Sequence, residues 1–184
     1  MTTKPPSFPF ARSYWAAPGR LLAGCYPGDA IPAEARLKLA ALVRSGVRRV
    51  VNLMELNEVN WQGKPFIDYT GVLEEVAQQA GQKVCVERIS IRDNNVPSVG
   101  QMTTILDAID QGIDAGEVVY VHCWGGKGRT GTVVGCFLAR HGQAVGDAVL
   151  TRLNELVQHK IELFGRVPQT PAQCDFVCNW RLGQ

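Results

Sequence analysis

The chain of 184 residues has no long apolar run and almost no net charge. A helix that crosses a bilayer needs about 18 or more consecutive apolar residues. The sequence contains no such run, so we expect no membrane span. The formal net charge of +2 is too small to indicate a nucleic acid or a membrane surface as a partner. Residues 1–10 are rich in proline and lack the continuous apolar segment of a signal peptide. We therefore expect a cytoplasmic protein.

Cysteine and histidine are few, and their spacing indicates neither a disulfide framework nor a metal site. The six cysteines are spread over a chain that is long for a disulfide-stapled protein, so we expect reduced thiols. Cys174 and Cys178 lie one helical turn apart, but the second pair that a zinc site would need is missing. The three histidines are far apart in sequence. We expect no metal and no other cofactor.

Strands and helices alternate along the chain, without an internal repeat or a change of composition. The apolar patterns predict strands at 47–53, 84–91 and 118–122, and helices at 32–44, 66–80, 98–115, 131–140, 145–161 and 171–182. Residues 20–23 form a further short apolar run before a turn. Such alternation favours an α/β fold, with a mainly parallel sheet of about four to five strands flanked by helices on both faces. We expect one domain at residues 19–184, with residues 1–18 as an extended segment packed on it.

The most informative segment is the strand predicted at 118–122 and the loop that follows it. The strand ends in Cys123, and a loop with three glycines leads to Arg129. Glycine lets successive backbone N–H groups turn inward and form a concave nest for an oxyanion. The start of the next helix and the guanidinium add positive charge. The same groups favour the thiolate form of Cys123, and a thiolate under a bound phosphate can attack phosphorus.

Three other interpretations of this loop fit less well. Residues 126–131 match G-x-G-x-x-G, the fingerprint of dinucleotide-binding loops, but the acidic residue expected about 20 positions later is missing. An ATP-binding P-loop needs Ser or Thr after Gly-Lys, and position 128 is glycine. A tight turn with a buried structural cysteine is common, but it gives no reason for Lys127 and Arg129 in one glycine loop.

The residues around Cys123 also carry a resemblance to a known family. His122-Cys123 followed by Arg129-Thr130-Gly131 resembles the H-C-x5-R-[ST]-G signature of the cysteine-dependent protein tyrosine phosphatases. The length of the chain and the late position of the cysteine resemble those of the small, dual-specificity-like (atypical) branch of this family. The resemblance implies a phosphotyrosine-phosphatase-like fold and a phosphomonoester hydrolase that works through a phosphocysteine intermediate.

The resemblance implies a protein tyrosine or dual-specificity phosphatase, acting on a phosphorylated protein or a small anionic phosphoester, and we expect a monomer. Lys127 is similar to a lysine in lipid phosphatases, so a phosphoinositide or inositol-phosphate phosphatase is an alternative. A non-catalytic phosphate-binding module is another, although such a module has no need of Cys123. A sulfur-transfer enzyme is a third, although the Arg-Thr-Gly exit of the loop fits phosphate better.

A phosphatase of this type needs a proton donor, because expulsion of an unprotonated alkoxide or phenoxide is costly. Asp93 is the best candidate, because it follows the neighbouring predicted strand, at the same end of the sheet as Cys123. The family that the chain resembles places its general acid on such a loop. The alternatives are that Asp93 only shapes a turn, or that Asp68, Glu55 or Glu58 is the acid.

Two further residues have both a catalytic and a structural interpretation, and the sequence leaves both open. Thr130 can donate its hydroxyl to the Cys123 sulfur, or it can cap the helix that begins there. Gln173 is similar to a late glutamine of the family, in the position to orient the hydrolytic water. It also completes a capping box with Thr170.

The expected phosphate-binding residues form the loop itself: Trp124, Gly125, Gly126, Lys127, Gly128 and Arg129. Trp124 can stack on a phosphotyrosine ring, or it can pack against the neighbouring helix. Pocket depth separates phosphotyrosine from phosphoserine and phosphothreonine as substrates. We expect that depth to depend on Trp61, Trp124 and the loop at 57–65.

Overall fold

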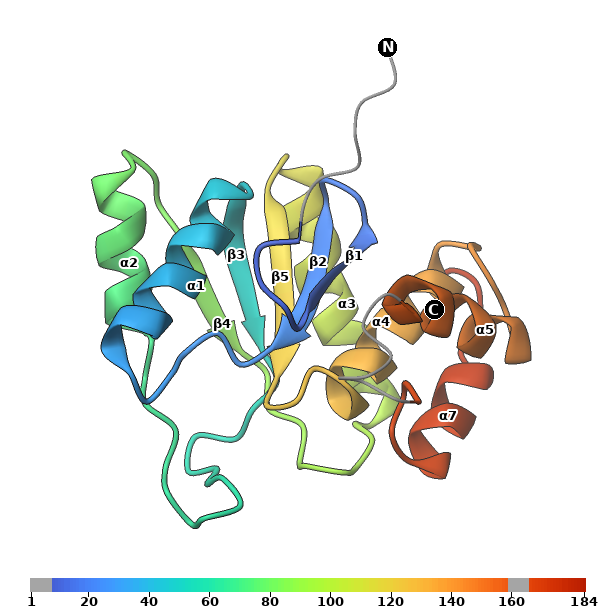
Figure 1. The fold of residues 1–184 in the computed structure, drawn as a ribbon. Helices are drawn as coiled ribbons and strands as arrows, with labels where there is room; N and C mark the ends of the chain where they lie inside the picture. The colour runs from blue at the N-terminus through green and yellow to red at the C-terminus, as the bar shows by residue number, and fades with distance from the viewer. Residues whose placement is uncertain (1–7, 159–165) are drawn as a thin grey trace.

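A five-stranded sheet in the order β1-β2-β5-β3-β4 forms the centre of the computed structural model, which describes residues 8–158 and 166–184 (Figure 1). The strands are β1 (Ser13–Ala17), β2 (Leu21–Cys25), β3 (Val47–Asn52), β4 (Cys85–Arg88) and β5 (Val118–Cys123). β1 runs antiparallel to β2, and the other neighbouring pairs are parallel. The predicted mainly parallel sheet is therefore confirmed, and the N-terminal segment supplies its antiparallel edge strand.

Helices cover both faces of the sheet, as predicted (Figure 1). They are α1 (Pro32–Arg44), α2 (Thr70–Gln79), α3 (Val99–Asp114), α4 (Gly128–Arg140), α5 (Asp147–Val157) and α7 (Pro171–Cys178). α1 and α2 form one core with Tyr120 of β5, whereas α3 and α4 form the other with Val121. The two cores follow from the alternation of side chains along a strand. No helix within the described residues combines the length and apolarity needed to span a bilayer.

Three predicted helices are shorter in the structure. The helix predicted at 171–182 is α7, which ends at Cys178. The helix predicted at 66–80 begins at Thr70, because the Asp68 carboxylate accepts a hydrogen bond from the Thr70 N–H at 2.9 Å and holds the chain before it in a turn. The helix predicted at 145–161 is α5, which ends at Val157. The last three residues of that prediction lie outside the described part of the chain.

The helix predicted at 131–140 begins three residues earlier, inside the glycine loop. The Gly131 N–H already donates to the Lys127 carbonyl at 3.0 Å, and the Thr132 hydroxyl donates to the Gly128 carbonyl at 2.8 Å. The loop after β5 therefore passes directly into α4. As a result, the positive end of the α4 dipole lies within the loop and not beyond it.

Glycine allows the loop after β5 to pack on the backbone of β2. A Cβ atom at Gly126 would lie 2.7 Å from the carbonyl carbon of Gly24, and Gly126 has a φ of +74° that L side chains rarely adopt. Gly24 is equally crowded. Its Cβ would lie 2.6 Å from the Arg12 carbonyl oxygen and 2.7 Å from the Tyr120 hydroxyl. These two glycines hold β1, β2 and the loop together.

We expect Gly24→Ala to lower the free energy of unfolding by roughly 1–3 kcal/mol, because the added methyl group meets backbone that cannot move without disturbing β1. Urea unfolding measures the change. Gly100→Ala in α3 is the matched control, since no atom lies within 4 Å of its new Cβ. It should leave stability unchanged or raise it by up to about 1 kcal/mol. Equal stability of the two variants would contradict the close approach at Gly24.

Candidate active site

The carboxyl ends of β3, β4 and β5 bring three loops to one edge of the sheet (Figure 1). Glu58 follows β3, Asp93 follows β4 and Cys123 ends β5. A pocket of about 440 Å³ opens at this edge. Its described lining residues are Arg12, Trp61, Asp93, Asn94, Cys123, Trp124, Gly125, Gly128, Arg129 and Gln169. The sequence candidates Cys123, Arg129 and Asp93 therefore meet in one pocket, at the end of the sheet where α/β folds bind ligands.

Cys123 is buried and faces the hydroxyl of Thr130. The Thr130 Oγ1–Cys123 Sγ distance is 3.1 Å, and the hydroxyl also lies 3.3 Å from the Gly24 carbonyl oxygen. A hydroxyl has one proton to donate, and a charged acceptor makes the stronger bond. With Cys123 as a thiolate, the Thr130 hydroxyl therefore donates its hydrogen bond to the sulfur and not to the Gly24 carbonyl. The N-cap of α4 is Lys127, without a side-chain cap, so the capping role considered for Thr130 is not observed.

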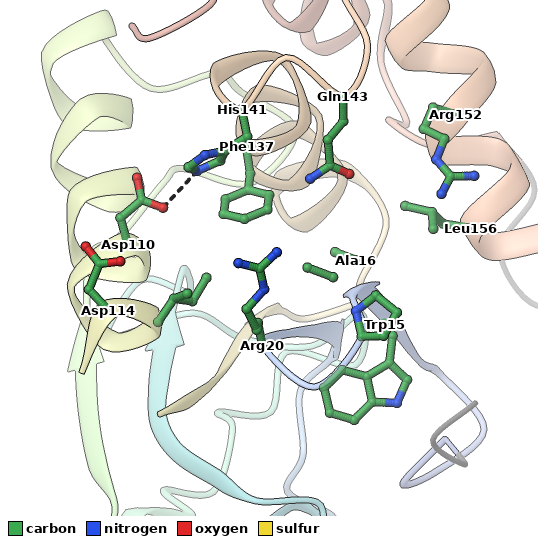
Figure 2. Close-up of a pocket in the computed structure, with 13 residues that line it drawn as sticks. Trp15, Ala16, Arg20, Asp110, Asp114, Phe137, His141, Gln143, Arg152 and Leu156 are labelled. Atoms are coloured by element: carbon green, nitrogen blue, oxygen red, sulfur yellow. Dashed lines mark hydrogen bonds and ion pairs between the residues drawn. The ribbon is translucent and has the colours of Figure 1, made fainter. Parts of the chain in front are cut away.

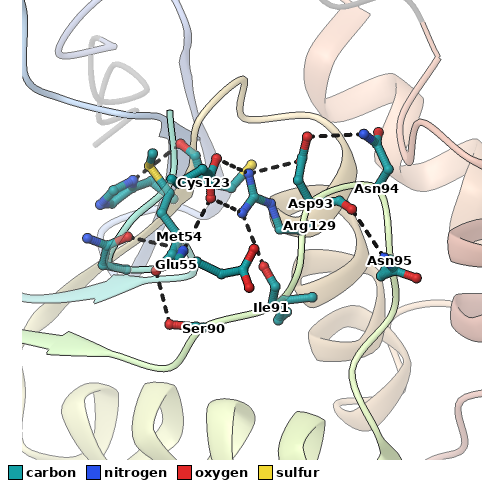
Figure 3. Close-up of polar contacts among 12 residues, drawn as sticks. Met54, Glu55, Ser90, Ile91, Asp93, Asn94, Asn95, Cys123 and Arg129 are labelled. Atoms are coloured by element: carbon teal, nitrogen blue, oxygen red, sulfur yellow. Dashed lines mark hydrogen bonds and ion pairs between the residues drawn. The ribbon is translucent and has the colours of Figure 1, made fainter. Parts of the chain in front are cut away.

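The guanidinium of Arg129 is almost fully buried and connects the loops (Figure 3). Its two terminal nitrogens bind the two carboxylate oxygens of Glu58 at 2.6 and 2.7 Å. One of them also donates to the Ile91 carbonyl at 3.1 Å, and the other lies 3.0 Å from the Asp93 carboxylate. Burial lowers the pKa of Arg129, but the hydrogen bonds to Glu58 and the charges of Cys123 and Asp93 outweigh it, so the net pKa is raised. The group remains cationic.

Asp93 points into the pocket from the loop after β4 (Figure 3). One carboxylate oxygen lies 3.0 Å from Arg129, and the other accepts a hydrogen bond from the Asn94 side chain at 3.0 Å. Asn94 has a φ of +60°, a conformation that Asn tolerates better than most residues. The Asp93 side chain is 47% exposed, so it is within reach of a substrate. The turn and the acid interpretations are thus compatible, because the turn aims the carboxylate at Arg129.

Gln173 lies behind the Asp93 loop and is absent from the described pocket lining. The predicted capping box is confirmed: its Oε1 accepts from the Thr170 N–H at 3.1 Å, and Thr170 Oγ1 accepts from the Gln173 N–H at 3.3 Å. The Gln173 Nε2 donates to the Asn95 carbonyl at 3.2 Å. A Cβ atom at Gly128 would lie 2.9 Å from Gln173 Oε1. The buried amide therefore supports both the Asp93 loop and the start of α4.

His122 is a buried structural residue below the loop. Its Nε2 lies 2.6 Å from the Tyr69 hydroxyl, and its ring stacks on Tyr120 with centroids 5.6 Å apart. Its Nδ1 lies 3.3 Å from the Cys123 carbonyl oxygen. Burial lowers the pKa of His122 to about 3. The imidazole is therefore neutral, and it fixes the end of β5 through hydrogen bonds.

The remaining residues expected to contact the substrate lie at different distances from the pocket. Trp124 lines the pocket and also packs edge-on against Phe66, with ring centroids 5.4 Å apart. Trp61 stands at the pocket with 81% of its surface exposed. Gly126 packs on β2, away from the pocket. Lys127, the residue on which the phosphoinositide alternative is based, is not among the described residues that line the pocket.

The alternative acids are also accounted for. Asp68 accepts a hydrogen bond from the Thr70 N–H, and both Asp68 and Glu55 line a separate small cavity of about 80 Å³. The Glu58 side chain is only 9% exposed and is paired with Arg129. Among the described residues, none of these three carboxylates lines the pocket that contains Cys123.

Two residues have site contacts that the sequence does not predict. The sequence indicates Glu58 only as a possible acid, although a buried arginine needs a carboxylate partner and the loop after a neighbouring strand can supply one. Arg12 donates from its Nη2 to the Gly125 carbonyl at 2.9 Å, across 113 residues of sequence. No local motif marks Arg12, because the contact exists only after β1 has paired with β2.

A larger cavity of about 780 Å³ lies at the opposite end of α4 (Figure 2). Three of its lining residues are paired: Asp110 binds His141 at 2.9 Å and Arg140 at 3.0 Å, and Arg152 binds Glu155 at 2.9 Å. Its described lining residues include no cysteine. In addition, no group of three or more His, Cys, Asp and Glu side chains among the described residues could hold a metal ion. The chemistry that the sequence predicts therefore belongs to the pocket around Cys123.

A comparison with known families decides the class of protein. Residues 27–143 match the family described as "Polymorphic toxin system, DSP-PTPase phosphatase". The chain belongs to this phosphatase family. The predicted resemblance to the dual-specificity-like protein tyrosine phosphatases is therefore confirmed. The matched range contains Asp93, Cys123 and Arg129, whereas Arg12 and Gln173 lie outside it.

Individual relatives agree with this family. A 66-residue segment of the phosphatase is 33% identical to "Phosphatidylinositol 3,4,5-trisphosphate 3-phosphatase and protein-tyrosine-phosphatase PTEN1" of Arabidopsis thaliana. That match covers 35% of this chain and only 16% of the relative. The curated relative is thus a much longer protein, of which the phosphatase matches a small part.

Solved structures share the fold over nearly the whole chain. Tk-PTP in its active form is 24% identical with a TM-score of 0.62, over 90% of this chain and 93% of that one. P. aeruginosa TpbA in complex with pTyr is 17% identical with a TM-score of 0.64, over 95% and 87%. PTPMT1 in complex with PI(5)P is 17% identical with a TM-score of 0.61, over 91% and 93%.

Glu58→Gln removes a negative charge from the Arg129 guanidinium and should let it shift. The sequence predicts Arg129 as the phosphate-binding group, and a displaced guanidinium would hold the phosphate out of line with the nucleophile. We therefore expect kcat/KM for 4-nitrophenyl phosphate to fall by roughly 10- to 100-fold. The inhibition constant for inorganic phosphate should rise in parallel. Exposed Glu55→Gln, three residues earlier, is the matched control and should keep wild-type values. Wild-type kinetics in Glu58→Gln would show that Arg129 is positioned without this pair.

The lowered pKa of His122 makes stability depend on pH. The unfolded chain binds a proton at His122 below about pH 6.5, whereas the folded chain binds it only near pH 3. Stability is therefore lost as the pH falls below the unfolded pKa. We expect the fall in unfolding free energy between pH 7 and pH 5 to be smaller in His122→Asn than in the wild type by about 2 kcal/mol. The same pH dependence in His122→Asn and in the wild type would contradict a neutral His122.

Proposed function

We propose that this phosphatase cleaves phosphomonoesters, foremost phosphotyrosine-type protein substrates, with Cys123 as nucleophile, Arg129 as phosphate-binding group and Asp93 as general acid. The observation that carries the proposal is the convergence of these three side chains in one pocket. The two structural neighbours solved with pTyr and with PI(5)P hold phosphomonoesters of different kinds. The exposed Trp61 and the pocket-lining Trp124 favour an aromatic ester here.

In the first step, the Cys123 thiolate attacks phosphorus. A sulfur–phosphorus bond forms, the bond from phosphorus to the ester oxygen breaks, and protonated Asp93 gives its proton to the leaving oxygen. Arg129 and the backbone N–H groups of the loop stabilise the charge on the phosphoryl oxygens. Arg129 lies 3.0 Å from Asp93, so a bound phosphate competes for that guanidinium and turns Asp93 towards the leaving group.

In the second step, water attacks the phosphocysteine. Asp93, now ionised, takes a proton from the water, and the sulfur leaves as a thiolate. Thr130, whose hydroxyl lies 3.1 Å from the sulfur, stabilises the departing thiolate by a hydrogen bond. Gln173 positions the Asp93 loop through the Asn95 carbonyl and does not need to touch the water itself.

Three variants test the assignment on 4-nitrophenyl phosphate and on a phosphotyrosine peptide. We expect Cys123→Ser to abolish turnover of both. Asp93→Asn should lower kcat on the peptide by about 10²- to 10⁴-fold, and less on 4-nitrophenyl phosphate, whose leaving group needs little protonation. Asp68→Asn is the matched control and should retain wild-type kcat.

Two outcomes would contradict the assignment. If Asp68→Asn loses the peptide activity and Asp93→Asn keeps it, Asp68 is the acid. If the wild type binds orthovanadate but turns over neither substrate, the protein is a phosphate-binding module.

A further inference from the structure

The cavity at the far end of α4 has the size of a small-molecule site (Figure 2). Its volume of about 780 Å³ lies within the range of roughly 300–1,000 Å³ that is typical of ligand pockets. The turn between β1 and β2 and the helices α3, α4 and α5 all contribute described residues to its wall. None of these residues also lines the pocket around Cys123, so the two spaces are separate.

A β-bulge in β1 leaves part of this space without large side chains. The pairing of β1 with β2 shifts between Trp15 and Ala17, and Ala16 and Ala17 both join the core under α3 and α4. A regular strand would send only one of two neighbouring side chains to that face. Both alanines line the cavity. Two methyl groups therefore stand where larger side chains would have filled it.

Arg20 points its guanidinium into this space, towards Phe137 (Figure 2). Its backbone is held on both sides, because its N–H donates to the Ala17 carbonyl at 3.0 Å and its carbonyl accepts from the Val119 N–H at 2.8 Å. Within residues 8–158 and 166–184, no hydrogen bond or ion pair involves the Arg20 side chain. A fixed backbone thus presents a fork of N–H donors that a ligand can occupy.

Basic and acidic side chains lie on different walls of the cavity (Figure 2). The carboxylates of Asp110 and Asp114 come from α3, whereas the guanidinium of Arg152 comes from α5, beyond Arg20. Arg152 is paired with Glu155 at 2.9 Å, but about half of each side chain is exposed, and exposed pairs contribute little. Arg20 and Arg152 therefore form a cationic side of the cavity that is open to an anion.

The rest of the lining favours one anionic group on an apolar body. Phe137 and Leu156 line the cavity besides the two alanines, so an apolar body can be buried while its anion binds Arg20. The planar fork of a guanidinium matches the two oxygens of a carboxylate. A phosphomonoester fits less well, because it carries about two negative charges at pH 7 and Asp114 adds a like charge to the opposite wall.

We propose that this cavity is a second binding site, which takes a small organic monocarboxylate with its carboxylate on Arg20 and its apolar body against Ala17 and Phe137. The proposal does not depend on the proposed function. The cavity shares no described lining residue with the pocket around Cys123, and binding can be measured without turnover.

NMR titration of the isotope-labelled protein tests the proposal with three pairs of probes. The pairs are benzoate and benzamide, 2-naphthoate and 2-naphthamide, and hexanoate and hexanamide. The members of a pair have nearly the same shape and differ in charge. We expect the carboxylates to shift the backbone amide signals of residues 16–20 and 137–143, and at least one carboxylate to bind about tenfold more tightly than its amide.

Substitution of Arg20 assigns the preference to its side chain. Arg20→Gln should weaken binding of the carboxylate by about tenfold and leave binding of the amide unchanged. Arg20→Lys keeps the charge but not the fork and should give an intermediate affinity. Both variants should fold, because the turn uses only the backbone of Arg20. Arg36→Gln, an exposed arginine of α1 paired with Glu75, is the matched control and should keep the wild-type affinity.

Each outcome decides for or against the site. A carboxylate preference that Arg20→Gln removes supports it. Equal affinity for carboxylate and amide in all three pairs overturns the role of Arg20, as does a preference that persists in Arg20→Gln. Signal shifts confined to the residues around Cys123, or no shifts with any probe, overturn the cavity as a binding site. None of these results changes the outcome of the Cys123→Ser and Asp93→Asn tests, so either proposal can fail without the other.

Discussion

The candidate active site, at the carboxyl end of the sheet, depends on one buried cation, the guanidinium of Arg129. A guanidinium taken out of water must be surrounded by acceptors, and Arg129 finds them on two different loops. Glu58 follows β3, and Ile91 and Asp93 follow β4. The order β5-β3-β4 at this side of the sheet makes that possible, because it places both loops beside the start of α4. Arg129 thus connects the two loops and the start of α4 through charged contacts. A substitution of one of its partners is expected to alter its contacts with the others.

The sequence predicts the parts of the structure that local signals encode. The alternation of strands and helices predicts the sheet, and the glycine loop between Cys123 and Arg129 predicts the anion site, because chain neighbours determine both. Asp93 is within reach of prediction, since it follows a strand that ends at the same edge. Arg12 and the Glu58 pair are not, because their contacts join segments that only the finished sheet brings together. Helix boundaries shift by a few residues where a side chain binds the backbone close by, as Asp68 does at Thr70.

Gln173 illustrates why a structural and a functional interpretation of one residue need not exclude each other. A primary amide has an acceptor end and a donor end. The acceptor of Gln173 completes the capping box of α7, and the donor holds the carbonyl of Asn95 behind the Asp93 loop. The same residue therefore begins a helix and supports the Asp93 loop. The sequence contains only the first half of this information, because the second half requires α7 to pack beside α4.

The position of Gln173 late in the sequence also determines the order in which the parts of the site are synthesised. Cys123 and Arg129 are synthesised 50 and 44 residues before Gln173, so a nascent chain contains the glycine loop before α7 exists. During that interval neither the Asn95 carbonyl nor the Gly128 turn has the amide behind it. The support behind the Asp93 loop and the Gly128 turn is therefore among the last parts of the structure to be synthesised.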